Sequence, residues 1–169
     1  MSNPRIMLGG LPLELHAGVP VETLEPAGGG TLHRMSDGAL VKQTLWQKYQ
    51  GTISAEGWMP PGLDGLDYSG PLELRSTKVQ AVGGPGLVYA LLGTPRPDFP
   101  AWGLALVGRD WVRTPCSVVD GVATLTEVEG ATAYRVCWMP VFSVFCDRPS
   151  ETQNSAGNTH SWQLTWLEN

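Results

Sequence analysis

The amino-acid sequence predicts a mainly β protein: an antiparallel β-sandwich or barrel-like domain with long loops rich in glycine and proline and little helix. Three observations predict this fold. Short apolar segments of strand length recur along the chain, separated by turns centred on glycine. Glycine and proline supply 21 and 14 of the 169 residues, well above their usual joint share of about 12%. No amphipathic pattern with i, i+3, i+4 spacing runs beyond about two helical turns.

Chain length and proline placement set the expected domain organisation. The 169 residues are enough to bury one core, so we expect a single β-rich domain over residues 1–169. Three prolines within Thr94–Pro100 fix φ and remove amide donors, which predicts an extended loop there. The candidate internal boundary is therefore near residues 93–101. Leu87–Leu92, just before it, is interpreted as a buried strand or a short helical turn.

Charge and hydropathy argue against several classes of function. The net charge is −5 and the 11 Lys and Arg residues are scattered, which argues against nucleic acid as a main partner. No apolar run approaches the ~20 residues that cross a bilayer, so no membrane insertion is expected. Met1–Arg5 lacks the features of a signal peptide, so we expect synthesis in a cytoplasm. Only 16% of residues are charged and seven are tryptophan, which indicates that other proteins cover part of the surface.

The first half of the chain is expected to contain short strands and one long hairpin. Ile6–Leu8, Leu11–Leu15 and Val19–Leu24 are short apolar pieces, and Pro26–Gly30 is interpreted as a flexible, linker-like connection. Asp37-Gly38 favours positive φ and predicts a hairpin that joins Thr31–Met35 to a strand over Ala39–Ile53. Alternation along that strand predicts half exposure, with Val41, Gln43, Leu45, Gln47 and Tyr49 on one face and Lys42, Trp46 and Lys48 on the other.

The second half shows a more regular strand pattern. Gly108-Arg109-Asp110 and Asp120-Gly121 are predicted turns, and Cys146–Asn158 is interpreted as a polar loop. In the last predicted strand, His160–Leu167, Trp162, Leu164 and Trp166 alternate with polar residues, as in a strand with one wet face. The other strands are expected at 102–107, 111–114, 116–119, 122–128 and 133–145. Core packing is the expected role of Trp102, Trp111, Trp138, Trp162 and Trp166.

The sequence contains no recognisable catalytic, cofactor or metal motif. A nucleophile elbow, a phosphate-binding loop and a dinucleotide fingerprint are all missing, so we expect no enzyme and no cofactor. A triad assembled in space stays open, because such groups need not be near in sequence. Asp64, Asp67 and Glu73 lack the spacing of a calcium loop and are expected to be turn residues. The histidines are expected in surface or capping roles, and the cysteines as buried thiols, with one disulfide as the alternative: His16, His33, His160, Cys116, Cys137 and Cys146.

The segment Gly57–Tyr68 is the predicted contact with a neighbouring protein. It is apolar, stiffened by two prolines and framed by glycines, and its residues offer no chemistry. Trp58 has two readings: it plugs the edge of a sheet, or it anchors a neighbouring subunit. The predicted interface residues are Trp58, Met59, Pro60, Pro61, Leu63, Leu66 and Tyr68.

Four blocks of the sequence resemble tail structural proteins of tailed bacteriophages: Leu32–Thr44, Ser54–Leu63, Leu66–Tyr68 and Pro71–Arg75. The nearest comparison is with distal-tail or baseplate-type ring proteins of long, non-contractile tails. Ala131–Phe145 and the Trp-rich last strand are similar as well, so that about half of the chain is covered. The similarity lies in overall pattern and contains no diagnostic motif.

The resemblance implies a β-sandwich with projecting loops that assembles into a ring, commonly hexameric, at the end of the tail tube. Implied partners are further copies of the chain and the tail tube, tape measure and baseplate hub proteins, in a virion assembled from the bacterial cytoplasm. Typical distal-tail proteins are longer, so a minimal version or another ring, such as a tail terminator or neck component, stays open. The rival interpretation is a carbohydrate- or receptor-binding sandwich at the tail tip, with Trp162 and Trp166 as its exposed aromatics.

Overall fold

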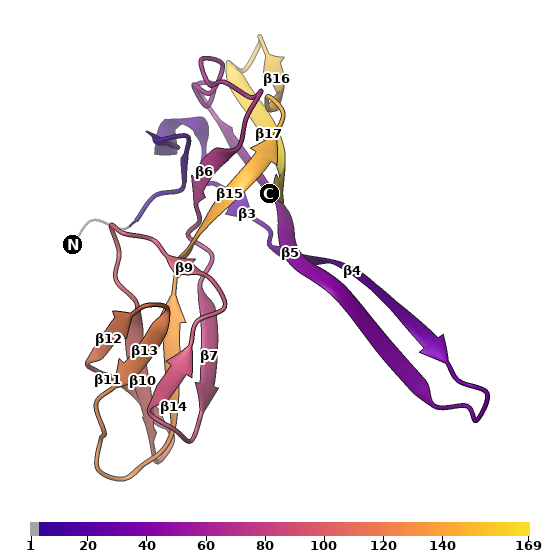
Figure 1. Cartoon of the computed structure of the whole chain (residues 1–169). Coiled ribbons are helices and arrows are strands. Elements are labelled where there is room, and N and C mark those ends of the chain that lie inside the picture. The colour runs from indigo at the N-terminus through magenta and orange to yellow at the C-terminus, as the bar shows by residue number, and fades with distance from the viewer. Residues whose placement is uncertain (1–3) are drawn as a thin grey trace. The chain divides into compact units, whose positions relative to one another are not determined.

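The computed structural model describes residues 4–169 and confirms a mainly β, antiparallel fold (Figure 1). Its backbone contacts divide the chain into two compact units. Unit 1 combines the chain up to Pro12 with Glu73–Phe142, and unit 2 combines Leu13–Leu72 with Ser143–Asn169. The predicted boundary region, residues 93–101, lies inside unit 1, and the number of domains stays a prediction. No helix in the described chain is long and apolar enough to cross a bilayer.

Unit 1 is a small β-sandwich. One sheet has the order β11-β10-β14-β7 and the other has the order β12-β13-β8. Ala105, Tyr134, Val136 and Trp138 from the first sheet share one apolar core with residues of the second. The bounds are β7 Gln80–Gly84, β8 Val88–Ala90, β10 Trp102–Val107, β11 Asp110–Thr114, β12 Cys116–Val119, β13 Val122–Leu125 and β14 Ala131–Trp138.

The remaining strands of unit 1 bring distant segments together. Strands β1 (Met7–Leu8) and β2 (Leu11–Pro12) pair with each other, and β1 pairs with β6 (Leu72–Arg75). Strand β9 (Thr94–Pro95) pairs with Pro140 and Val141 of β15 (Pro140–Cys146). Residues 140–142 of β15 belong to unit 1, whereas residues 143–146 belong to unit 2.

Unit 2 is built around β17 (Thr159–Glu168), which pairs with β5 (Leu40–Gly57) over His160–Leu167. Strand β16 (Ser150–Asn154) and the end of β15 pair with β17, while β3 (Val21–Glu22) pairs with β5. The buried side chains come mainly from one face of these strands and from the segments that cover it, including the short 3-10 helix Leu15–Ala17. They include Leu13, Ala17, Ile53, Leu63, Val144, Cys146, Trp162, Leu164 and Trp166.

Strands β4 (Glu25–Arg34) and β5 form a long hairpin (Figure 1). We call the ribbon made of β4 and residues 40–50 of β5 the arm. The predicted Asp37-Gly38 turn is confirmed, because Gly38 has φ +87° and Asp37 Oδ1 accepts a 3.0 Å hydrogen bond from the Ala39 amide. The predicted turns at Gly108 and at Asp120-Gly121 are confirmed by positive φ angles as well.

Three predictions about the arm are wrong. Pro26–Gly30 is part of β4, where it pairs with Tyr49 to Thr44, and is not a linker. A β-bulge at Leu45 exchanges the two faces of β5, so Gln47 and Tyr49 share a face with Lys42, while Trp46 and Lys48 share a face with Val41 and Gln43. Leu40–Lys48 is also exposed on both faces, not half-exposed.

Two predictions in the second half also need correction. The interval Cys146–Asn158 contains β16, whose residues pair with Thr159–Gln163, so it is not only a loop. The predicted strand 133–145 is two strands, because Met139 separates β14 from β15. The last strand is confirmed, with one residue more at each end, and Leu87–Leu92 contains strand β8.

Candidate protein interaction site

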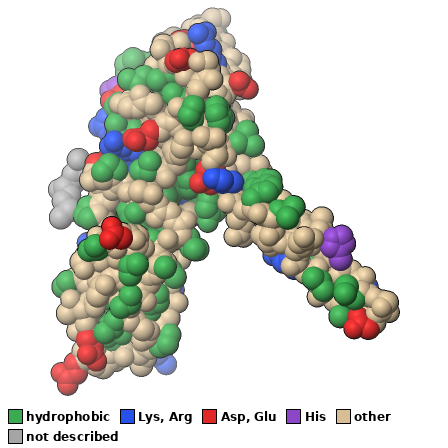
Figure 2. Space-filling model, in the orientation of Figure 1, with side chains coloured by type: hydrophobic (Ala, Val, Ile, Leu, Met, Phe, Trp, Pro, Cys, Tyr) green, Lys and Arg blue, Asp and Glu red, His purple; other side chains and the backbone are tan. Residues whose placement is uncertain are grey.

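The arm exposes several large apolar side chains. Leu32 is 67% exposed, Leu45 is 74% exposed and Trp46 is 52% exposed. Figure 2 shows hydrophobic side chains at the surface along the arm, interspersed with polar ones. An isolated two-stranded hairpin is at best marginally stable in water, so contact with another surface would stabilise the arm.

The edges of the arm carry no further strand among residues 4–169. Strand β4 pairs with β5 alone, and the pairing of β17 with β5 ends at Gln50. Near that point the Tyr49 amide donates to Glu168 Oε2 at 2.7 Å, and Lys48 Nζ donates to the Asn169 carbonyl at 2.7 Å. Beyond it, both edges of the ribbon are available to pair with a strand of another chain.

The contact between Gly29 and Trp46 explains why β4 stays paired with β5 through the glycine run. A Cβ added to Gly29 would collide with Trp46 Nε1, so the indole lies directly over the glycine backbone. Glycine is usually unfavourable within a strand because it packs no side chain of its own. Here the indole of Trp46 covers the position instead, and the glycine run stays in the β4 pairing.

The tip of the arm has one face that alternates basic and apolar side chains. Antiparallel partners share a face, and the register pairs Leu32 with Lys42 and Arg34 with Leu40. Leu40 is 60% exposed, and Arg34 Nη1 donates to the Gly38 carbonyl at 3.2 Å. We call Leu32, Arg34, Leu40 and Lys42 the basic–apolar face of the arm.

The charge of the arm is opposite to that of the rest of unit 2. Residues 25–50 contain three basic residues, Arg34, Lys42 and Lys48, and two acidic residues, Glu25 and Asp37. The rest of unit 2 has one basic residue, Arg148, and eight acidic ones: Glu14, Glu22, Glu56, Asp64, Asp67, Asp147, Glu151 and Glu168. Attraction between the basic arm of one copy and the acidic remainder of unit 2 in another favours association between copies.

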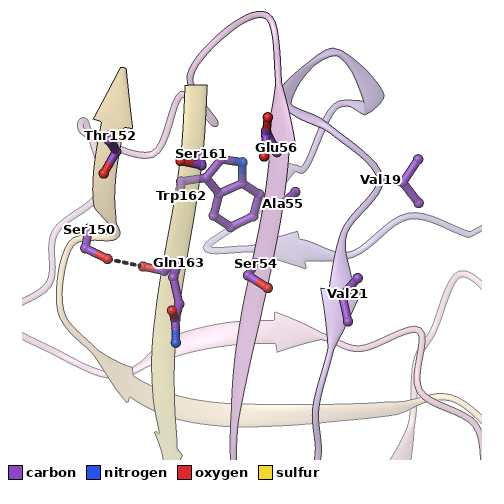
Figure 3. Close-up of a pocket in the computed structure, with 10 residues that line it drawn as sticks. All are labelled: Val19, Val21, Ser54, Ala55, Glu56, Ser150, Thr152, Ser161, Trp162 and Gln163. Carbon is purple, nitrogen blue, oxygen red and sulfur yellow. Dashed lines mark hydrogen bonds between the residues drawn. The ribbon is translucent and has the colours of Figure 1, made fainter. Parts of the chain in front are cut away.

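A hollow of about 480 Å³ lies on the sheet β3-β5-β17-β16 of unit 2 (Figure 3). One row of the register across it is Val21, Ser54, Gln163 and Ser150, and the next is Glu56, Ser161 and Thr152. Ser150 Oγ donates to the Gln163 carbonyl at 3.3 Å. Val19 and Val21, 76% and 63% exposed, line one side of the hollow, and Glu56 is the one charged residue among the described residues that line it.

The predicted interface loop does not form one surface. Trp58, Met59 and Pro60 are exposed, Leu66 and Tyr68 are half-buried, and Pro61 and Leu63 are buried. The Tyr68 hydroxyl donates to the Leu63 carbonyl at 2.8 Å, which holds the loop closed. Trp58 packs on His16 with ring centroids 5.2 Å apart, and its amide donates to the His16 carbonyl at 3.1 Å.

Substitutions in this loop should therefore separate core from surface. We expect Leu63→Ala to lower the free energy of unfolding by about 2–5 kcal/mol, because Leu63 is 1% exposed and its removal leaves a cavity. Trp58→Ala, at a 58% exposed residue, should change it by less than about 1 kcal/mol. Urea unfolding of both variants checks this, and equal losses would contradict the assignment of Trp58 to the surface.

The tryptophans proposed as an exposed binding platform are buried, so that part of the rival interpretation is wrong. Trp162 is 3% exposed, and its Nε1 donates to the Ala17 carbonyl at 2.8 Å; Trp166 is 0% exposed. Core packing is thus confirmed for these two and for Trp138, whereas Trp111 is 40% exposed. Trp102 is half-buried.

A different aromatic surface lies on the outer face of the sheet β11-β10-β14-β7. The guanidinium of Arg135 lies over the Trp111 ring at 4.6 Å, and that of Arg113 over the Trp102 ring at 5.9 Å. The register places Arg113, Leu104 and Arg135 side by side on this face. Tryptophan and arginine are the residues most enriched at binding hot spots.

The other residues considered for chemistry lie apart from one another. No group of three or more His, Cys, Asp or Glu side chains within residues 4–169 is arranged to hold a metal ion. The three cysteines are free, and burial raises the pKa of the Cys137 and Cys146 thiols. Asp67 is a turn residue as predicted: its Oδ1 accepts from the Ser69 amide and hydroxyl, and these hydrogen bonds lower its pKa. The same prediction is wrong for Glu73, which lies in strand β6.

No protein-family model matches this chain, and no curated protein matches it. The candidate interaction site therefore rests on the arm, the hollow and the charges of unit 2.

Proposed function

We propose that this protein is a structural component of a bacteriophage tail that forms a ring at the distal tail or baseplate and joins the tail tube to the tip. The observation that carries this proposal is the arm, an exposed apolar ribbon with unpaired edges among the described residues. Such a ribbon gains stability by contacting a neighbour, and a head-to-tail contact forms a ring when its repeated rotation brings the last copy back to the first. The resemblance to tail proteins supports the biological setting.

In this role the protein acts by binding other proteins and performs no reaction. The partners are further copies of the chain, in a ring of hexameric order, with the tail tube, tape measure and baseplate hub above and below. The location is the virion tail, reached after synthesis in the bacterial cytoplasm. A tail terminator or neck ring would use the same head-to-tail contact between copies at another level of the tail.

The test is the mass of the purified protein by light scattering, followed by negative-stain imaging. We expect a discrete species several times the 18.2 kDa of one chain, seen as closed rings. Open filaments, or dimers that never close, would contradict the ring. Addition of the tail-tube protein would then show whether the ring stacks on a tube.

A receptor- or carbohydrate-binding role at the tail tip is the second candidate function. The observation that favours it is the outer face of the unit 1 sheet, where Trp111 and Trp102 lie beside Arg135 and Arg113. Binding on a glycan array that Trp111→Ala weakens by more than about 10-fold would support it. Binding left unchanged by this substitution would contradict it.

A further inference from the structure

We propose that the basic–apolar face of the arm docks in the hollow on the β3-β5-β17-β16 sheet of a second copy of this chain. This inference rests on the proposed ring for its biological setting. It adds which surface of one copy meets which surface of the next. The contact is heterologous, because the arm and the hollow are different parts of the molecule.

Charge is the first argument that the occupant of the hollow is another copy of this chain. The basic–apolar face presents Arg34 and Lys42, and Glu56 is the one charged residue among the described residues that line the hollow. Outside the arm, unit 2 has eight acidic residues against one basic residue. A basic arm is therefore attracted to the acidic unit 2 of another copy, which orients the encounter.

Apolar complementarity is the second argument. Leu32 and Leu40 are 67% and 60% exposed on the arm, and Val19 and Val21 are 76% and 63% exposed beside the hollow. Docking would remove both sets from water. The neutral lining side chains Ser54, Thr152, Ser161 and Gln163 can meanwhile hydrogen-bond to polar groups of the ribbon.

Size is the third argument. Four adjacent strands span about 15 Å, and a two-stranded ribbon is about 5 Å between its strand axes, so the sheet is wide enough to seat the arm tip with its side chains.

A charge exchange tests this contact on the full-length protein. Lys42→Glu on the arm and Glu56→Lys in the hollow each place like charges together, so each variant alone should self-associate at least about 10-fold more weakly than wild type. In a mixture, the acidic arm of the first variant meets the basic hollow of the second, and the unchanged basic arm of the second meets the unchanged acidic hollow of the first. We therefore expect the mixture, and the double variant, to regain the wild-type mass by light scattering.

Two matched controls isolate the proposed surfaces. Gln43→Glu adds a negative charge next to Lys42 but on the opposite face of the arm. Glu151→Lys reverses an exposed acid on β16 that lies between Ser150 and Thr152 but does not line the hollow. Both controls should assemble as wild type. Loss of assembly in the controls equal to that in the test variants would show a general charge effect and overturn the proposal.

A cysteine pair tests the same contact where association is weak. Leu32→Cys mixed with Val21→Cys under oxidising conditions should yield a disulfide-linked dimer well above the amount from either variant alone. Lack of this dimer, together with wild-type assembly of Glu56→Lys, would overturn the proposal. If the docking fails this test but closed rings still form, the proposed function stands without the docking. If the charge exchange restores dimers but no rings form, the docking stands and the proposed ring is contradicted.

Discussion

Replacing Arg96 with methionine is expected to lower the free energy of unfolding of unit 1 by about 2–4 kcal/mol, because carbonyl acceptors lose a charged donor. Arg96 is 2% exposed although it lies in a proline-rich loop. Its guanidinium donates to Asp98 Oδ1 and Oδ2 at 2.8 and 2.7 Å, to the Ser76 carbonyl at 3.2 Å and to the Arg5 carbonyl at 2.9 Å. Methionine fills much of the volume but leaves these acceptors without their donor.

The control for this substitution is Arg109→Met, at an exposed arginine in the turn between β10 and β11. It removes the same charge and should change the free energy of unfolding by less than about 0.5 kcal/mol. Urea unfolding, followed by a signal from unit 1, measures both. A small loss in Arg96→Met, similar to that of the control, would show that the buried guanidinium contributes little to the stability of unit 1.

The same pair predicts a dependence on pH. The hydrogen bonds from Arg96 lower the pKa of Asp98 below its usual value. A carboxyl group with a lowered pKa in the folded state stabilises that state above its unfolded pKa of about 3.9, and this contribution is lost as pH falls through the folded value. Because the Asp98 side chain is 39% exposed, the effect is modest, and Asp98→Asn should flatten this part of the stability profile.

Excising the arm is expected to abolish self-association while unit 2 keeps its fold. Ala27 and Lys48 are directly opposed in the register, so Asn-Gly in place of residues 28–47 can close a two-residue hairpin there. The shortened chain keeps the pairing of β17 with β5 and the buried Ile53, Leu164 and Trp166. Light scattering should find only monomers at concentrations at which the full-length chain assembles.

Two outcomes would contradict this expectation. Assembly of the shortened chain at wild-type concentrations would show that another surface, such as the Trp58 loop, holds the copies together. Loss of the tryptophan fluorescence and circular dichroism of the folded state would show that the arm is needed to fold unit 2. The substitution Lys42→Glu, which leaves the arm in place, separates these two causes.

Turns and strand alternation could be predicted from sequence because their causes are local. Asp37-Gly38 and Asp120-Gly121 favour positive φ wherever they occur, and the structure has a turn at each. Alternation correctly placed Trp162, Leu164 and Trp166 on one face of the last strand. It does not by itself say which face is covered, and for that reason one interpretation placed two buried tryptophans at the surface.

The features that sequence reasoning missed depend on pairing between distant residues. Gly28–Gly30 resembles a linker until Trp46 of the facing strand covers it. The bulge at Leu45 changes the faces of β5 through its register with β4, which no local pattern encodes. Strand β16 is exposed at every position, so it lacks the apolar alternation that marks a strand. The burial of Arg96 depends on acceptors that are distant in sequence, such as the Arg5 carbonyl, so the neighbouring residues do not predict it.

The interleaving of the two units has a consequence for the order of events during synthesis. The arm leaves the ribosome early, whereas the hollow needs β16 and β17, which come last in the chain. During synthesis the arm is therefore complete before the strands that form the hollow have been made. Under the proposed docking, a growing chain could place its arm in the hollow of a finished copy before its own hollow could accept an arm.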